Sequence, residues 1–243
     1  ITNDPFKGHC NHLPDWGFIR PVFYEDELVF VLLTRGHQQD TGGSFPGGYF
    51  ANGYDIHAEG LIIPPIKIYD RGVERSDVLE LIWNNVRFPE GVKIDNYALM
   101  AGLTVGEKRI HSLLDKYGKE SVLNCVEEML DRMEVNVRAT ITEIPDGTYF
   151  GESATDDDGT TLDEQVWVRC EATIAGDEMT LDFTESDDQR TGFVNCVLAS
   201  TYSRAVAGSF LFFDPEYSPF HNAGSMRPIT LIAPEGSVCN AQY

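Results

Sequence analysis

Two runs of strand-forming residues close to the start of the chain constrain its fold most strongly. Residues 18–24 and 28–34 are rich in aromatic and β-branched side chains, and the acidic residues 25–27 separate them. This pattern predicts an antiparallel hairpin. Antiparallel pairing brings the residues before the first strand beside those after the second. We therefore expect residues 9–12 and 35–40 to meet at the open end of the hairpin.

Four side chains at that open end are candidate metal ligands: His9, His12, His37 and Asp40. Three imidazoles and a carboxylate suit a divalent ion of borderline hardness. The alternative is that these are ordinary polar side chains at the surface. The predicted metal site therefore depends on the hairpin bringing the two segments together.

Further polar residues lie close to these four in the sequence. Asp4 and Asp15 are candidates for additional ligands or for acceptors of imidazole N–H groups, and either could instead cap a turn. Asp55, His57 and Glu59 alternate, so on a strand all three side chains would share one face. That face would supply extra ligands, with Asp55 and His57 first, or would simply be solvated.

A glycine-rich loop follows the second strand. Residues 42–48 contain two pairs of glycines, which favour irregular backbone. Aromatic residues flank this loop and would either exclude water from the site or make ordinary packing contacts: Phe45, Tyr49, Phe50 and Tyr54.

Composition excludes some classes of function. The 243 residues carry a formal net charge of −21, which argues against a nucleic-acid-binding protein because phosphate contacts need Lys and Arg. No segment approaches the roughly 18 apolar residues needed to span a membrane. Five scattered cysteines without a CxxC pair fit the reduced thiols of a cytoplasmic protein. The chain opens on Ile1 without a methionine, so we expect either the middle of a longer polypeptide or a processed chain.

The hydrophobic patterns predict an α+β fold with short mixed sheets in the N-terminal and C-terminal parts and a helical hairpin between them. Residues 1–75 form the β-rich region with the metal site, 76–137 a helical region, and 138–243 a strand-rich region. Helices are expected at 76–86, 96–117 and 120–135, with the last two as the hairpin, and an apolar helix at 195–213. Strands are expected at 139–144, 165–174, 178–183 and 229–233.

Several common motifs are absent from the sequence. The acidic residues 156–159 lack the glutamate that a calcium loop needs at its twelfth position. Residues 102–108 have one residue too few between their glycines for a phosphate-binding loop. There is no G-x-S-x-G nucleophile elbow and no G-x-G-x-x-G dinucleotide motif. The sequence therefore offers no nucleotide-binding motif of these kinds.

Three motifs in the first seventy residues resemble those of the hydantoinase B/oxoprolinase family. They lie at residues 3–15, 36–43 and 59–69, and residues 222–236 add weaker similarity. The His-Cys-Asn-His run at 9–12 is more similar to the alpha subunit of acetone carboxylase than to hydantoinases, which tend to have Gly-Gly-Thr-His there. The Gly-His-Gln-Gln-Asp run at 36–40 also differs from hydantoinases, and this difference likewise favours the acetone carboxylase alpha subunit.

The resemblance implies a catalytic role for His12, His37 and Asp40 at a manganese site, with iron or zinc as alternatives. It implies an assembly with a beta-type, hydantoinase A-like partner that binds ATP, and with a gamma subunit, as in a heterohexamer. The expected reaction joins acetone or another small ketone to bicarbonate and gives a 3-oxo acid, acetoacetate. One alternative is a hydantoinase or 5-oxoprolinase subunit that opens a cyclic amide. The other is a non-catalytic assembly piece with a structural metal.

Overall fold

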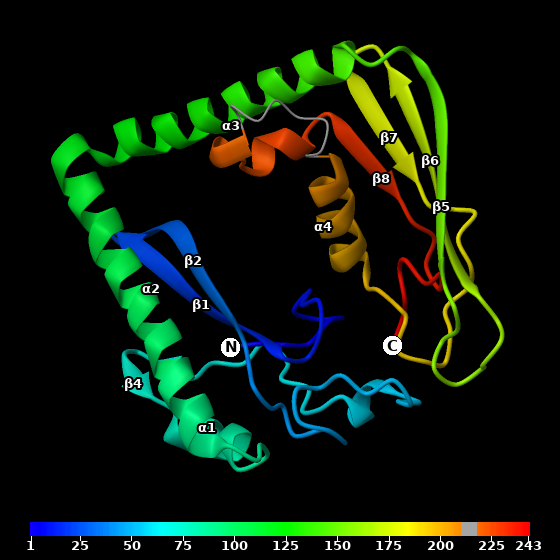
Figure 1. Cartoon of the computed structure of the whole chain (residues 1–243). Helices are drawn as coiled ribbons and strands as arrows, with labels where there is room; N and C mark the ends of the chain where they lie inside the picture. Colours follow the sequence, from blue (N-terminus) through cyan, green and yellow to red (C-terminus); the bar gives the residue numbers. More distant parts are fainter. Residues whose placement is uncertain (210–217) are drawn as a thin grey trace. The chain divides into compact units, whose positions relative to one another are not determined.

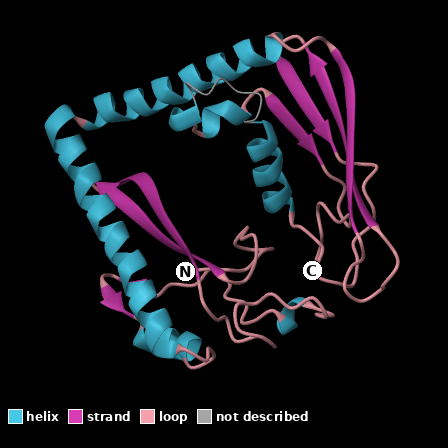
Figure 2. Cartoon of the chain, in the orientation of Figure 1, coloured by secondary structure: helices cyan, strands magenta, loops and turns pink. Residues whose placement is uncertain are grey.

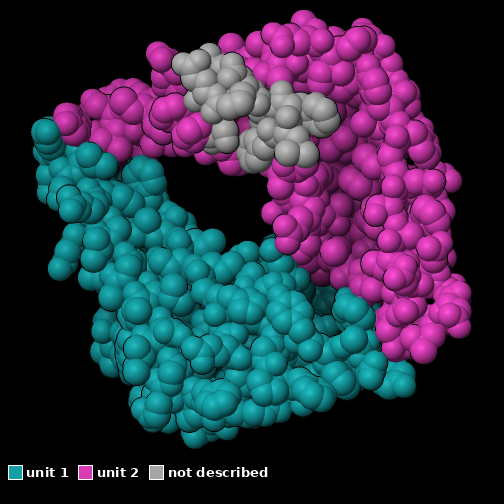
Figure 3. All heavy atoms as spheres, in the orientation of Figure 1, with its two compact units in different colours: residues 1–116, 191–193 teal, residues 117–190, 194–243 magenta. Residues whose placement is uncertain are grey.

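The structure is a computed structural model that describes residues 1–209 and 218–243. Its helices and small sheets confirm the predicted α+β class (Figures 1 and 2). The chain divides into two compact units, which Figure 3 distinguishes. The first contains residues 1–116 and 191–193, and the second contains residues 117–190 and 194–243.

The predicted hairpin is present in the first unit. Strand β1 (Asp15–Tyr24) pairs antiparallel with β2 (Glu27–His37). Glu25 and Asp26 form the turn, and both have positive φ, as in the two-residue turns that match the twist of a hairpin. Both strands extend three residues further at the open end than predicted, so Asp15 lies directly opposite His37.

Two helices share the apolar core of this unit with the hairpin. Helix α1 (Ser76–Trp83) and helix α2 (Pro89–Tyr117) enclose the apolar core of the unit together with Trp16 and Phe18, both almost fully buried. Helix α2 begins seven residues earlier than predicted, because Pro89 suits the first turn of a helix, where an N–H has no intrahelical partner.

Glycines bring the hairpin very close to α2. A β-carbon at Gly36 would lie 2.7 Å from Leu99 Cδ1, and one at Gly106 would lie 3.1 Å from Leu32 Cδ1. Both distances are below ordinary van der Waals contact, so a larger residue at either position would require the leucine side chain to move.

Buried polar side chains join the end of the hairpin to both helices. Trp83 Nε1 donates to Asn96 Oδ1 at 3.0 Å, and Asn96 Nδ2 donates to Gln38 Oε1 at 3.1 Å. The rest of the unit is mainly loop, including residues 42–48 as predicted. It also contains a short ribbon of β3 (Tyr69–Asp70) and β4 (Val73–Glu74) and the 3-10 turn η1 (Ile56–Ala58).

The second unit packs a helix against a four-stranded sheet. Helix α3 (Lys119–Thr142) is followed by β5 (Gly147–Thr155), β6 (Val166–Ala175) and β7 (Glu178–Asp182) in antiparallel order. Strand β8 (Ile229–Ile232) pairs parallel to β7. Helix α4 (Leu198–Ser209) and the short turns η2 (Ser218–Phe220) and η3 (Ala223–Met226) complete the unit.

The predictions for this half are mostly confirmed, with one clear error. The two-residue turn at Gly176 and Asp177 joins β6 to β7 as expected. The strand predicted at 139–144 is wrong, because α3 continues through Thr142 and buries Val137 and Ile141 on the same face. Strand β5 was not predicted. The helix predicted at 195–213 is observed as α4, and residues 210–213 lie outside the described residues.

The two long helices belong to different units. Only Gly118 separates α2 from α3, and the boundary between the units falls at this joint. The pairing of these helices as a hairpin, and the division into three regions, stay predictions. None of the helices in the described ranges is both long and apolar enough to cross a membrane.

Candidate metal site

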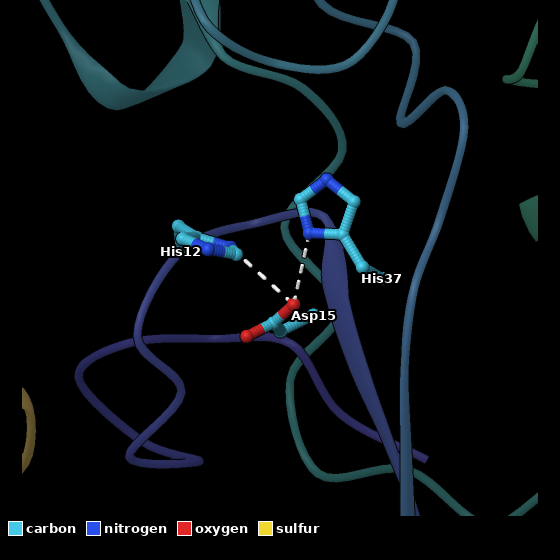
Figure 4. A group of neighbouring side chains, drawn as sticks. All are labelled: His12, Asp15 and His37. Carbon is cyan, nitrogen blue, oxygen red and sulfur yellow. Dashed lines mark hydrogen bonds and ion pairs between the residues drawn. The ribbon is translucent and has the colours of Figure 1, made fainter. Parts of the chain in front are cut away.

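Three side chains gather at the open end of the hairpin: His12, Asp15 and His37 (Figure 4). One potential ligand atom from each lies within 4.8 Å of the others. His37 Nδ1 is 3.1 Å from Asp15 Oδ1, and His12 Nδ1 is 3.6 Å from the same oxygen. Among the described residues, this is the one group of three or more potential ligands with this spacing.

Local structure explains why these three residues meet. Asp15 and His37 form the last pair of the hairpin. His12 lies in the turn before β1, where its carbonyl accepts from Asp15 N at 3.1 Å. The fully buried Asn3 holds this turn in place, because its amide donates to the Leu13 and Leu61 carbonyls at 2.8 and 2.9 Å.

The donor set fits a divalent ion. His12 Nδ1 is buried and has no hydrogen-bond partner in the structure, and such an atom is costly unless something binds it. Two imidazole nitrogens and one carboxylate oxygen suit manganese, iron or zinc. Catalytic sites of this kind use three protein ligands and leave other positions open to water or substrate. The three residues therefore have both the chemistry and the spacing to bind a metal.

The Tyr49 ring contacts both imidazoles. Its hydroxyl lies 3.2 Å from His12 Nε2, and its ring is stacked on the His37 ring with centroids 5.9 Å apart. The two histidine rings meet edge to face, with centroids 5.1 Å apart. Tyr49 thus contacts both imidazoles. The sequence suggested only that it shields the site from water or makes ordinary packing contacts.

Asp40, predicted as a ligand, is not brought into this group. Its fully buried carboxylate accepts a hydrogen bond from Arg87 Nη1 at 2.7 Å, and it also accepts from the backbone N–H of Arg87 and of Gly42. This ion pair joins the loop after β2 to the segment before α2. The carboxylate is therefore held by Arg87 and does not join the group of His12, Asp15 and His37.

Two other predicted residues also lie outside the group. His9 is exposed and has a φ of 53°. The Asp4 carboxylate caps a turn by accepting from Phe6 N at 2.9 Å and Lys7 N at 3.0 Å. For Asp4 the structure thus supports the alternative of a turn cap.

Residues 55–59 do not form the strand that would align Asp55, His57 and Glu59 on one face. Residues 56–58 form η1, and Asp55 caps it by accepting from His57 N at 2.9 Å and Ala58 N at 3.2 Å. Asp55 and His57 are both exposed, and neither joins the group of three. Glu59 is half-buried, and burial raises its pKa to about 7.

Asp15 is the residue whose importance the sequence underestimated. The sequence suggests only an extra ligand, an acceptor or a turn cap, yet Asp15 is the residue that contacts both histidines. The available signals were its three-residue spacing from His12 and its position opposite His37 once the strands are extended. Arg87 was missed altogether, because nothing near position 40 in the sequence points to a partner 47 residues away.

Comparisons with known proteins agree with the motifs. A profile of the family described as Hydantoinase B/oxoprolinase matches residues 1–243. The chain is 35% identical to the beta chain of caprolactamase from Pseudomonas jessenii, with 99% of this chain and 41% of that protein covered. It is 34% identical to a putative D-/L-hydantoinase component of Pseudomonas sp. (strain NS671), with 99% and 42% covered. The acetophenone carboxylase delta subunit of Aromatoleum aromaticum is 29% identical, with 76% and 27% covered.

Structural similarity supports the same relationship. The crystal structure of the ATP-dependent caprolactamase from Pseudomonas jessenii matches with a TM-score of 0.92, at 35% identity over 99% of this chain and 41% of that one. The chain spans about two fifths of the length of the two Pseudomonas relatives. Both the whole-length profile match and these identities confirm the resemblance predicted from the motifs, and the chain belongs to the hydantoinase B/oxoprolinase family.

Proposed function

We propose that this chain is the metal-binding catalytic portion of an ATP-dependent, multi-subunit enzyme that acts on the carbonyl group of a small cyclic amide. The observation that carries the proposal is the convergence of His12, Asp15 and His37 at the open end of the hairpin. Similarity to caprolactamase and hydantoinase components supports a cyclic amide as the substrate class.

The three side chains would hold the ion, with manganese expected and iron or zinc as alternatives. A bound ion would act as a Lewis acid that polarises a carbonyl oxygen. Asp15 supplies negative charge and orients both imidazoles. An ion with open coordination positions would favour a catalytic site, whereas zinc closed by four protein ligands would favour a structural one. ATP would be bound by a hydantoinase A-like partner, as the family resemblance implies.

ATP-dependent carboxylation of a small ketone is the second candidate. The His-Cys-Asn-His run at residues 9–12 favours it, and so does the similarity to an acetophenone carboxylase subunit. In this case the polarised oxygen would belong to an enolate that attacks activated bicarbonate, and acetone would give acetoacetate. The same three ligands serve both candidates, because both reactions develop negative charge on a carbonyl oxygen.

Metal content tests the site itself. We expect the purified protein to retain close to one equivalent of a divalent metal, His37→Ala to lose it, and His57→Ala to keep it. His57 is a matched control because it is a histidine of the same unit that lies outside the group. Elemental analysis of the three proteins gives the answer. Absence of metal from the wild type, or equal metal in both variants, would contradict the proposal.

Product formation distinguishes the two reactions. The full-length polypeptide that contains this chain, assembled with its ATP-binding partner, should open lactam or hydantoin rings in an ATP-dependent manner. Formation of acetoacetate from acetone that depends on both ATP and bicarbonate, without ring opening, would instead support the carboxylase. Activity that persists in the metal-free His37→Ala enzyme would rule out a catalytic metal for either reaction.

A further inference from the structure

One aromatic side chain contacts both histidines of the metal site. Tyr49 Oη lies 3.2 Å from His12 Nε2. The Tyr49 ring stacks on His37 with an interplanar angle of 18°, and it meets the His12 ring at 71° with centroids 5.7 Å apart. Yet 66% of Tyr49 is exposed, so burial of the ring explains little of its placement.

The backbone of the preceding loop is shaped to place Tyr49 there. Gly47 and Gly48 both have positive φ, at 84° and 70°. A β-carbon at Gly48 would lie only 2.9 Å from Pro14 Cγ and 3.2 Å from the Glu59 carbonyl oxygen. Pro14 lies between His12 and Asp15 in the sequence, so the loop is packed directly against the segment that carries two of the ligands.

The contact between the Tyr49 hydroxyl and His12 Nε2 can fix the tautomer of the imidazole. A neutral imidazole carries one N–H, and the tautomer decides which nitrogen can bind an ion. His12 Nδ1 faces Asp15, and Nε2 faces the Tyr49 hydroxyl. If Nε2–H donates to Tyr49 Oη, the Nδ1 lone pair is left free to point at the shared centre of the site. Hydrogen-bond partners of this kind fix both the tautomer and the ring orientation of a metal ligand.

We propose that Tyr49 is a positioning residue, which holds His12 in the Nε2–H tautomer and holds the His37 ring in place so that the site is preorganised for its ion. The inference rests on the metal-dependent function proposed above. It assigns to the loop after β2 a role in metal affinity, in addition to any role in shielding the site from water.

The hydroxyl and the ring can be tested separately. Tyr49→Phe removes the hydrogen bond and keeps the ring, whereas Tyr49→Leu removes both. Tyr54→Phe is the matched control, since Tyr54 is similarly exposed in the same loop region and the same atom is removed. Gly48→Ala tests the backbone, because the added methyl group must push the loop away from Pro14. Circular dichroism and thermal unfolding confirm that each variant is folded.

The first measurement is the affinity for Zn²⁺ and Mn²⁺, obtained by competition with a chelator. We expect Tyr49→Phe to weaken the affinity by about 10- to 100-fold, as is usual for loss of an outer-shell partner, and Tyr49→Leu to weaken it at least as much. Gly48→Ala should act in the same direction, and Tyr54→Phe should leave the affinity within about twofold of wild type.

The second measurement is independent of metal. Long-range ¹H–¹⁵N NMR of metal-free protein labelled on histidine reports the tautomer of His12, which should be Nε2–H in wild type and mixed or reversed in Tyr49→Phe. If wild type binds an ion and Tyr49→Phe binds it equally well, the inference fails and the proposed function stands. A changed tautomer without weaker binding also overturns it. If wild type binds neither ion, the proposed function and the inference both fail.

Discussion

Asp40 carries a fully buried charge whose partner is far away in the sequence. Its carboxylate accepts from the Arg87 guanidinium and from two backbone N–H groups, so removing it would leave several donors without a partner. Loss of one member of such a pair is costly because the remaining polar groups stay desolvated. The Arg87 side chain is 41% exposed, and water would relieve part of that cost.

Asp40→Ala should therefore reduce stability and spare the metal. We expect the free energy of unfolding to fall by about 2–4 kcal/mol, after allowance for the exposure of Arg87. The folded fraction should keep its ion, whereas Asp15→Ala should lose it. Urea unfolding and elemental analysis together make the test. Metal loss in Asp40→Ala with unchanged stability would restore Asp40 as a ligand.

Glu59 makes stability depend on pH. Burial raises its pKa in the folded protein from an ordinary value of 4.5 to about 7. The folded state therefore keeps its proton over a range of pH in which the unfolded state has lost it. The contribution of Glu59 to the free energy of unfolding therefore falls as the pH rises from about 4.5 to about 7, and it does not change further above that range.

Glu59→Gln should remove this dependence, because an amide resembles the protonated carboxyl and does not ionise. The variant should exceed wild type in the free energy of unfolding by about 1–3 kcal/mol at pH 8, a figure reduced for the partial exposure of Glu59, and the difference should vanish towards pH 4.5. Urea unfolding of both proteins at several pH values measures it. A constant difference across this range would contradict the prediction.

At the scale of elements, helix α3 shows how helical spacing prevails over local propensity. Residues 139–144 contain alternating threonine and isoleucine, which favour a strand. However, Met133, Val137 and Ile141 recur every four residues, and all three are buried in the core against the sheet. Continuing the helix buries Ile141, so packing outweighs the small helical penalty of the β-branched residues.

Two valines on α3 allow a matched test of this face. Val137 is 2% exposed and Val135 is 64% exposed. Val137→Ala should lower the free energy of unfolding by about 1–3 kcal/mol through lost burial and an unfilled cavity. Val135→Ala should change it by no more than about 0.5 kcal/mol, as for other exposed positions. Equal effects in chemical denaturation would show that the buried face has been misassigned.

At the scale of the whole molecule, elements with a strong local signal were predicted from the sequence. The hairpin, the four helices, the turn between β6 and β7 and the family itself follow from spacing and motifs. Strand β5 was missed because the segment Gly147–Thr155 is almost wholly exposed and so lacks an alternating apolar face. The ion pair between Asp40 and Arg87 was missed because it joins distant segments.

The sequence predicted only part of the group of candidate ligands, because the hairpin has a strong local signal and the ends of its strands do not. The meeting of His12 with His37 followed from the hairpin, which sequence patterns identify well. The place of Asp15 depends on strand ends, which patterns locate poorly, and three further residues on each strand bring it opposite His37. Asp40 was placed in the group because it is near His37 in the sequence, but a buried ion pair holds it elsewhere.

The close packing of the hairpin against α2 limits which residues can precede His37. Gly36 precedes His37 and lies against Leu99 with no room for a β-carbon. A larger side chain at Gly36 must therefore displace either Leu99 or the strand that carries His37. Displacement of that strand would change the distance between His37 and His12 without replacing either side chain.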